Sequence, residues 1–459
     1  MLIKEIQTKL DSFQLYSIFK DKKNSFFLDS GMDYDKLGKY SFIGFDPIEI
    51  IKSKNDNIEI KKDGKTEKFK GDPFEALRKI INKYKMDYNT DIPFIGGLVG
   101  YLSYDLCHFV EDLPRTAIDD VDIPDMYFGV YDGIIAIDHR NEKVYIAILG
   151  VKNDEEELFN YIYGEIKSAE EKGLDIEIKY RDDKEDMEFK SNFETEEKYR
   201  ESIEKVRSYI KSGDIYQANL TQRFECDLDI EPYDLYAKLR HINPAPFASF
   251  LDIDDLKIVS SSPERFIKIK DGIIETRPIK GTINRGSTKE DDEKNREILI
   301  NSKKDQAELL MIVDLERNDL GKIAKTGTVD VTELFHLEEY STVYHLVSTV
   351  VAEIDKKNDI VDCLKATFPG GSITGAPKIR AMEIIDELEP TQRNIYTGSI
   401  GYIGFNEDID LNIVIRTIVC KNDKAYFQVG GGITWDSDPK LEYEETLHKA
   451  KALMDSLNK

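Results

Sequence analysis

The chain has 459 residues, a formal net charge of −25 and a hydrophobic content of 40%. This length exceeds that of one ordinary core, so two or three core units or one large interleaved domain are expected. The acidic composition argues against nucleic-acid binding, because a negative surface repels phosphate backbones, and no apolar run of about 18 residues predicts a membrane span.

The first residues, MLIKEIQTKLDSF, are charged and lack the apolar core of a signal peptide, so a cytoplasmic location is expected. The cysteines stand far apart without a CxxC pair, at Cys107, Cys226, Cys363 and Cys420. This spacing is typical of plain buried thiols and not of a disulfide framework or a zinc site.

Residues 1–150 are predicted to form an N-terminal region that mixes strands with helices. KYSFIGFDPIEIIKS alternates like a strand that reaches a turn at Asp46 and Pro47. DPFEALRKIINKY has the pattern of a helix capped by Asp72. PFIGGLVGYLSYDL is apolar and rich in glycine, which indicates burial, and GVYDGIIAIDHRNEKVYIAILG predicts a hairpin with its turn near HRNEK.

Residues 151–195 interrupt this pattern. A charged amphipathic helix is followed by KYRDDKEDMEFKSN, which has almost no apolar residue. This composition is typical of a solvated connector, or of an exposed loop inside one domain.

The second region, residues 195–455, begins with a helix from Thr195 to about Gly213 and a strand in IYQANLTQRFEC. Further strands are predicted in FASFLDI, in KIVSSSPERFIKIKDGIIETRPIKGT and in NIVIRTIVCKNDKAYFQVGGGITW. Further helices are predicted over residues 290–312, 340–354, 376–388 and 440–457. Because hairpins join the strands as often as helices do, the pattern favours an α+β fold with large antiparallel sheets.

Two of these helices carry carboxylates that can bind a metal. Glu308 stands just before an apolar run, and Glu442, Glu445 and Lys449 share one helical face. Glutamates from separate helices that leave coordination positions open suit Mg²⁺ when a substrate supplies further oxygens. The spacing also fits solvated surface glutamates, so both interpretations stand at this point.

Glycine runs and basic residues mark a candidate anion site. FPGGSITGAPK precedes a helix, and VGGGITW offers a second close approach of backbone to a ligand, although each can also be a simple turn. The basic groups that can meet an anion are Lys280, Lys378, Arg380, Arg416 and Lys449. His345, in the apolar and helix-like YSTVYHLVS, is either a packed core histidine or a proton donor or acceptor near neutral pH.

Several long motifs occur in one order along the second region. They are GDIYQANLTQRF, SSPERF, RPIKGT, DLERNDLG, YHLVS, FPGGSITGAPKIRAMEIIDELEP, GSIGYIGF, and VGGGI followed by YEETLHKAKAL. Together they resemble the chorismate-utilising enzymes, which include the anthranilate, aminodeoxychorismate, isochorismate and salicylate synthases. The resemblance is dense over residues 195–455 and weaker at FFLDSG, KYSFIGFDP and GGLVGYLSYDL.

This resemblance implies a large α+β fold of two antiparallel sheets packed face to face, with helices outside and the site between the sheets. It implies that Glu308 and Glu445 bind Mg²⁺, that Glu264 is the acid near the reacting ring, and that His345 is the catalytic-site histidine and the second candidate for that acid. The residues that it implies around the substrate carboxylates and ring are Gly281, Thr282, Ser372, Tyr396, Arg416, Gly432 and Lys449.

Two positions separate branches of the family. Isochorismate-type members have a lysine that activates water where this chain has Gln217, and a glutamine cannot act as that base. Lys280 stands in PIKGT, which resembles the aminodeoxychorismate synthases, whereas the anthranilate synthases resemble PIAGT. FPGGSITGAPK and YQANLTQRF favour the same branch.

That branch implies conversion of chorismate and ammonia to 4-amino-4-deoxychorismate, for 4-aminobenzoate and folate synthesis. The Lys280 amine would attack C2 of chorismate before ammonia enters at C4, which splits one difficult displacement into two. No cysteine lies in the glycine-flanked elbow typical of a glutaminase. The family therefore implies a separate glutaminase subunit that docks on this chain as a heterodimer and supplies the ammonia.

A second pocket is suggested where relatives bind tryptophan. The matching residues are Leu28, Ser30, Tyr40, Phe42, Pro246 and Phe247. Aromatic packing explains them equally well.

Two further functions remain open on the sequence. One is anthranilate synthase component I, which forms anthranilate from chorismate for tryptophan synthesis. The other is a catalytically inactive anion-binding module built on the same fold.

Overall fold

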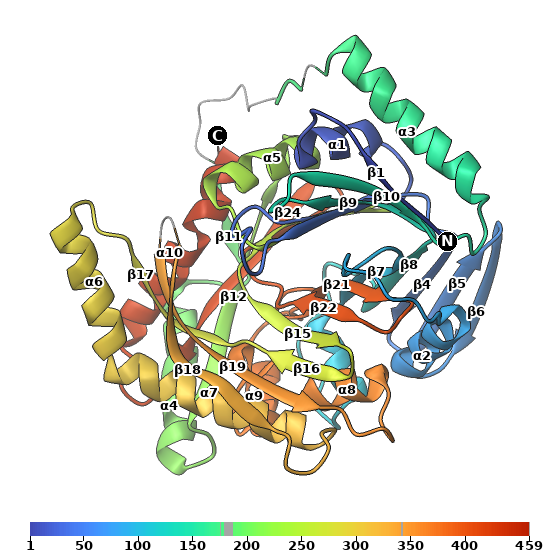
Figure 1. Cartoon of the computed structure of the whole chain (residues 1–459). Coiled ribbons are helices and arrows are strands. Elements are labelled where there is room, and N and C mark those ends of the chain that lie inside the picture. The colour runs from blue at the N-terminus through green and yellow to red at the C-terminus, as the bar shows by residue number, and fades with distance from the viewer. Residues whose placement is uncertain (175, 179–186, 341–342, 459) are drawn as a thin grey trace.

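The structure, a computed structural model, describes residues 1–174, 176–178, 187–340 and 343–458. Within these residues, two large sheets of 12 strands each form the centre of the molecule (Figure 1). Neighbouring strands run antiparallel in both sheets. The expected α+β class with large antiparallel sheets is therefore confirmed.

The strands of the first sheet follow one another in space in an order that differs from the chain order. They are β1 (Leu2–Ile6), β10 (Lys143–Ile148), β9 (Gly133–Asp138), β3 (Tyr40–Gly44), β2 (Phe26–Asp29), β13 (Phe247–Ile253), β14 (Leu256–Ser262), β23 (Thr417–Lys421), β24 (Lys424–Ile433), β12 (Gln217–Asp227) and β11 (Lys190–Ser191). The short β20 (Gly375–Ala376) pairs with β12.

The second sheet is built in the same way. Its strands are β17 (Ile279–Asn284), β19 (Val343–Glu353), β16 (Ile273–Thr276), β15 (Arg265–Lys270), β22 (Ile409–Asn412), β21 (Ser399–Gly404), β7 (Gly97–Leu102), β8 (Met126–Tyr131), β4 (Glu49–Lys54), β5 (Asn57–Lys62) and β6 (Lys65–Lys70). The long β18 (Asp330–Glu339) pairs with β19.

The two sequence regions meet once in each sheet. Residues 1–150 supply one contiguous block of strands, and residues 195–455, with the short β11 just before them, supply the other. The blocks join where β2 pairs with β13 in the first sheet and where β7 pairs with β21 in the second. Each region therefore contributes to both layers.

The first sheet is buried on both faces because successive residues of its strands are apolar and point to opposite sides. Phe26 and Phe42 point into the core shared with the second sheet, where the Phe42 and Tyr402 rings lie 5.6 Å apart. Their neighbours Phe27 and Ile43 belong to the core on the outer face. The two-residue period of a strand sends successive side chains to opposite faces.

Helices cover the outer faces of the sheets. The first sheet carries α1 (Ser12–Phe19), α3 (Glu155–Lys172), α5 (Pro232–Ile242) and α10 (Pro439–Asn458), with α4 (Glu196–Ser212) and α9 (Lys378–Leu388) around β12. The second sheet carries α6 (Lys289–Asn301), α7 (Lys303–Gly321) and α8 (Ile360–Thr367), and α2 (Pro73–Tyr84) packs against α8.

Several expected elements are confirmed with their local signals. Asp72 caps α2, where it accepts the backbone N–H of Phe74 at 2.8 Å. Thr195 caps α4, which ends at Gly213 in the left-handed conformation. The expected hairpin is β9–β10, closed between Asp138 and Lys143. β7 is buried throughout, as its glycine-rich composition indicated.

Two expected helices are wrong or divided. Residues 340–354 were expected to be helical, but Val343–Glu353 is strand β19, and residues 341–342 lie outside the described residues. The segment is rich in β-branched residues, which pack well in a sheet and are restricted in a helix. Residues 290–312 fall into α6 and α7, because Ser302 ends the first helix and caps the second.

The expected connector falls partly on residues 179–186, which lie outside the described residues. All four cysteines are buried and free, as expected. Among the described helices, none has both the length and the apolar composition that spanning a membrane requires.

Candidate active site

Lys280 lies in a β-bulge of β17. Ile279 pairs with Val347 of β19, and Thr282 pairs with His345, so β17 uses one more residue than its partner between the two pairs. Gly281 supplies the extra residue with a φ of +81°, a conformation that glycine adopts without strain. The bulge directs the Lys280 amine to the carbonyl oxygen of Ser372, to which it donates a hydrogen bond of 3.1 Å.

The Lys280 amine sits among the predicted site charges. Burial lowers its pKa from the ordinary 10.5, although the charges of Glu264, Glu308 and Glu445 act in the opposite direction. The nearby Lys449 ammonium lowers it further. The amine therefore lies within electrostatic reach of the two glutamates that were expected to bind metal.

Glu264 stands between β14 and β15 and is buried, with 6% of its surface exposed. Burial raises the pKa of its carboxyl, while a hydrogen bond from the Ser372 hydroxyl and the charges of Lys280 and Arg416 lower it. The backbone N–H of Ile279 reaches its Oε1 at 3.4 Å. This carboxyl is therefore an acid placed next to the lysine.

His345 lies on β19 and not on a helix, and it is 4% exposed. Its Nδ1 lies 2.8 Å from the hydroxyl of Thr282. Burial, with the charge of Arg416, lowers its pKa to about 4. The imidazole is therefore neutral near pH 7 and is a poor source of a proton.

Arg416 occupies the break between β22 and β23, so NIVIRTIV is not one continuous strand as expected. Its φ of +51° is left-handed. Burial lowers the pKa of its guanidinium, and Glu264 is the charge that opposes this. Within the described residues, the guanidinium has no hydrogen bond or ion pair. A cation in this state is suited to an incoming anion.

Helix α10 presents its charges to the glycine run of β24. Lys449 donates to the carbonyl oxygen of Gly430 at 2.9 Å and lies 2.7 Å from Glu445. A Cβ at Gly431 would lie 3.3 Å from Glu442 Oε2 and 3.5 Å from Glu445 Oε1. The absence of a side chain at Gly431 therefore leaves room beside two carboxylates.

Glu308 on α7 shares this space. Burial and the charge of Glu442 raise its pKa, while Lys280 and Lys304 lower it. The Lys304 ammonium, 3.9 Å from Glu308, also lowers the pKa of Glu445. Glu308 and Glu445 therefore lie on separate helices and both interact with the charges of Lys280 and Lys304, although the described residues hold no cluster of three or more metal-ligating side chains.

Gln217 and Gly432 lie next to the space beside Glu445. Gln217 is 1% exposed, and a Cβ at Gly432 would overlap its Nε2 at 2.2 Å. Gln217 Oε1 has no hydrogen-bond partner among the described residues. Tyr396 is buried beside Arg393 and lines a small hollow together with Thr417, the residue that follows Arg416.

Sequence reasoning missed one site residue and misplaced two basic ones. Lys304 is one helical turn before Glu308, and this spacing of four residues was the available signal. Lys378 was expected to meet an anion, but Asp319 and two backbone carbonyls hold it. Arg380 pairs with Glu383 and Asp214 at the surface.

The residues expected at a tryptophan pocket lie on adjacent strands. Leu28 of β2 is opposite Phe42 of β3, and β13 begins at Phe247 on the other side of β2. The Ser30 hydroxyl donates to the carbonyl oxygen of Tyr40 at 2.6 Å. Pro246 is buried just before β13. Tryptophan binding here stays a prediction.

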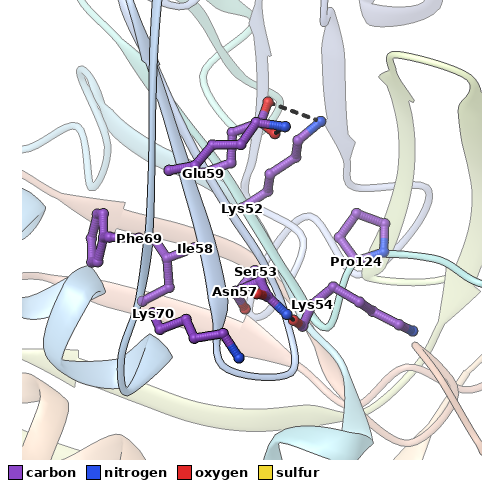
Figure 2. A pocket seen from close by; sticks show the side chains of 10 residues that line it. Lys52, Ser53, Lys54, Asn57, Ile58, Glu59, Phe69, Lys70 and Pro124 are labelled. Carbon is purple, nitrogen blue, oxygen red and sulfur yellow. Dashed lines mark hydrogen bonds and ion pairs between the residues drawn. The ribbon is translucent and has the colours of Figure 1, made fainter.

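A separate hollow of about 380 Å³ lies over β4, β5 and β6, at the opposite end of the second sheet from β17 (Figure 2). Four lysines line it, and each has a carboxylate within 4 Å; they are Lys52, Lys54, Lys68 and Lys70. None of the residues expected to act in catalysis lines this hollow.

Comparison with known proteins gives consistent matches over nearly the whole chain. The family model described as chorismate binding enzyme matches residues 23–455. Aminodeoxychorismate synthase component 1 of Bacillus subtilis (strain 168) is 40% identical, over 99% of this chain and 96% of that protein. Anthranilate synthase component 1 of Acetivibrio thermocellus is 39% identical, over 96% of this chain and 92% of that protein.

A solved structure agrees with these matches. Anthranilate synthase component I from Streptococcus pneumoniae TIGR4 superposes with a TM-score of 0.80 at 34% identity, covering 91% of this chain and 92% of that one. Overall identity does not separate the two kinds of synthase, since the values are 40% and 39%.

Proposed function

Because this chain belongs to the chorismate-binding enzyme family, we propose that it aminates chorismate at C4 to give 4-amino-4-deoxychorismate, the precursor of 4-aminobenzoate for folate synthesis. The observation that carries this proposal is the Lys280 amine, which burial makes easier to deprotonate and which lies beside Glu264 and Glu308. A neutral amine in such a position is a nucleophile. An alanine there, as in PIAGT, would have none.

The substrate's two carboxylates need partners in the site. No hydrogen bond or ion pair to the Arg416 guanidinium is found among the described residues, and Lys449 offers an ammonium next to the glycine run. Charge-assisted hydrogen bonds of this kind are strong and directional. They would orient the ring between Lys280 and Glu264.

We also propose that Glu308 and Glu445 hold Mg²⁺. Two carboxylates on separate helices, with room beside Glu445 at Gly431, suit an ion that takes its remaining oxygen ligands from the substrate. When bound, Mg²⁺ would supply positive charge that anchors the ring carboxylate and draws electron density from the ring.

The residues of this chain account for a balanced reaction. The Lys280 amine bonds to C2, the ring double bonds shift, and the C4 hydroxyl leaves as water after Glu264 protonates it. Ammonia then bonds to C4, the double bonds shift back, and the C2–nitrogen bond breaks to release Lys280. The nitrogen bound to C2 keeps its protons and leaves as the neutral Lys280 amine, and the ammonia-derived nitrogen at C4 passes one proton to Glu264, which restores the acid.

A second candidate is supported by the similarity to anthranilate synthases, at 39% identity. In that reaction ammonia attacks C2 directly and elimination follows to give anthranilate. Gly281, Glu264 and the two glutamates suit either reaction, so Lys280 is the residue that distinguishes them.

We further propose that a separate glutaminase subunit supplies ammonia, in line with the name "component 1" of the relatives. The purified chain should then turn over chorismate with ammonium salts and Mg²⁺ but not with glutamine. Turnover with glutamine by the chain alone would contradict this part of the proposal.

The deciding experiment compares the products of the parent chain and Lys280→Ala, with chorismate, ammonium salts and Mg²⁺. The parent should form 4-amino-4-deoxychorismate, and Lys280→Ala should lose C4 amination by about 100-fold or more. Lys322→Ala is a control, because it removes a half-exposed ammonium outside the site, and it should retain C4 amination. Full C4 amination by Lys280→Ala, or anthranilate as the product of the parent, would refute the proposal.

A further inference from the structure

The turn between α8 and α9 is bound to α7 by the buried carboxylate of Glu316, which has no part in the proposed reaction. The backbone N–H of Gly371 donates to Glu316 Oε1 at 3.1 Å, and the hydroxyl of Thr276 donates to Glu316 Oε2 at 3.3 Å. Glu316 is 3% exposed. A Cβ at Gly371 would lie 2.9 Å from Leu315, so the turn also packs directly against the helix.

An ion pair fastens the beginning of the same turn. Lys378 Nζ donates to Asp319 of α7 and to the carbonyl oxygens of Pro369, at 2.8 Å, and Thr367, at 3.1 Å. The side chains of Lys378 and Asp319 are 11% and 2% exposed. A buried pair of this kind is held by its additional hydrogen bonds, and removing one partner leaves an uncompensated charge.

This turn places Ser372 next to Lys280 and Glu264, the two groups on which the proposed chemistry depends. The Ser372 carbonyl oxygen accepts the hydrogen bond from Lys280, and its hydroxyl bonds to Glu264. Ser372 follows Gly371 directly, so a displacement of Gly371 moves Ser372 as well. Helix α7 also carries Glu308, so one rigid element sets the position of both the turn and the metal-side glutamate.

We propose that Glu316 and the Asp319–Lys378 ion pair are positioning residues that fix Ser372 and thereby aim the Lys280 amine at the substrate. This role rests on the proposed function of Lys280. A lysine amine ends a flexible four-carbon stem, so a fixed acceptor is needed to hold it in one direction. A misplacement of about 1 Å at a reacting group can reduce the rate by about 100-fold.

The first test uses Lys378→Met with Lys322→Met as the matched control. Lys322 bonds to the same Asp319, at 3.0 Å, but its side chain is 50% exposed and no hydrogen bond to the turn is found for it among the described residues. Without chorismate, the pH dependence of Lys280 acylation by acetic anhydride is followed by peptide mass spectrometry. Lys378→Met should move the midpoint upward, because a released amine leaves the buried position that lowers its pKa. Lys322→Met should leave the midpoint unchanged.

Kinetics provide a second readout on the same proteins. In Lys378→Met, kcat should fall by about 100-fold while KM stays within about threefold, because Arg416 and Lys449 still bind the substrate. Lys322→Met should change neither value. An unchanged midpoint and kcat in a folded Lys378→Met variant would overturn the inference.

If Lys378→Met does not fold, the variants Glu316→Gln and Glu316→Ala test the positioning role instead. Burial raises the pKa of Glu316 to about 7, so glutamine resembles the protonated carboxyl that exists near neutral pH. Glu316→Gln keeps an acceptor for Gly371 and should retain kcat within about threefold, whereas Glu316→Ala should lose about 100-fold. Equal losses in both variants, with the Lys280 midpoint unmoved, would refute a positioning role.

The readouts separate this inference from the proposed function. If Lys280→Ala retains C4 amination, the proposed function fails, while the acylation midpoints still report whether the turn aims Lys280. If C4 amination depends on Lys280 but substitutions at Lys378 and Glu316 change neither the acylation midpoint nor kcat, only the positioning role is refuted.

Discussion

Burial acts in opposite directions on the two groups of the proposed chemistry, Lys280 and Glu264. It lowers the pKa of Lys280 and raises the pKa of Glu264, so it favours a neutral amine and a protonated acid. Each charge partly reverses the effect on the other, because Glu264 raises the pKa of Lys280 and Lys280 lowers that of Glu264. A proton can therefore pass between them without changing the net charge of the site.

His345 should make the folded chain sensitive to mild acid. Its pKa is lowered from 6.5 to about 4, mainly by burial, so between these values the unfolded chain binds a proton that the folded chain does not. The free energy of unfolding therefore falls as the pH drops from 6.5 through 4, by about 2 kcal/mol at about pH 5, and this contribution is constant above 6.5. Urea unfolding at about pH 5 and pH 7.5 measures the loss.

The variant His345→Gln should lose about 2 kcal/mol less than the parent between these two pH values. His241→Gln, at an exposed histidine, is the control and should behave like the parent. An equal loss in the parent and in His345→Gln would show that His345 is not the group responsible.

The sequence allowed some of these residues to be placed together and not others. Spacing alone put Glu442, Glu445 and Lys449 on one helical face, and the structure has them there. The neighbourhood of Lys280 and Glu264 followed only from the order of the family motifs. The ion pair of Lys378 with Asp319 joins residues 59 positions apart, and no local pattern identifies such a partner.

At the scale of elements, β19 shows why a strand was expected to be a helix. It is flanked by β17 and β16 on one side and by β18 on the other, and seven consecutive residues of it are buried. A strand covered on both faces has a continuous run of apolar residues instead of alternating apolar and polar ones. The spacing of its apolar residues therefore does not distinguish it from a buried helix. Helices with an exposed face and a clear cap, such as α2 and α4, were predicted correctly.

The bulge in β17 should be the element most sensitive to a single added methyl group. Alanine at position 281 would have to adopt a φ of +81°, and its Cβ would lie 2.9 Å from both Asp305 and Leu299. We expect Gly281→Ala to lower the free energy of unfolding by about 1–2 kcal/mol and to reduce turnover by at least about tenfold, because the bulge that directs Lys280 is disturbed. Urea unfolding and chorismate turnover measure the two effects.

Gly272 offers a matched control for this substitution. Its φ is +75°, and no atom of the described residues lies within 4 Å of the position that a Cβ would take. Gly272→Ala should therefore show the backbone strain without loss of turnover. If Gly281→Ala and Gly272→Ala reduce turnover equally, the bulge does not direct Lys280.

At the scale of the whole molecule, the two sequence regions are held together by two strand pairs and by two cores to which both regions contribute. Each sheet changes from one region to the other at a single junction, β2 with β13 and β7 with β21. Aromatic rings cross between the regions as well, since Phe94 stacks on Tyr402 at 4.5 Å. The sequence did not predict how the strands of the two regions pair, because this pairing joins strands that are distant along the chain.

This arrangement predicts that residues 187–459 do not fold alone, although they contain every residue expected to act in catalysis. Without residues 1–174, the edges of β13 and β21 lose their partners and Tyr402 loses its cover. Exposed edges and apolar surface favour aggregation. We expect this fragment to be aggregated by size-exclusion chromatography and to lack a cooperative urea transition, whereas coexpression with residues 1–174 should restore a soluble complex, because both junctions can form again. A soluble, cooperatively unfolding fragment 187–459 would mean that the junctions contribute little to the fold.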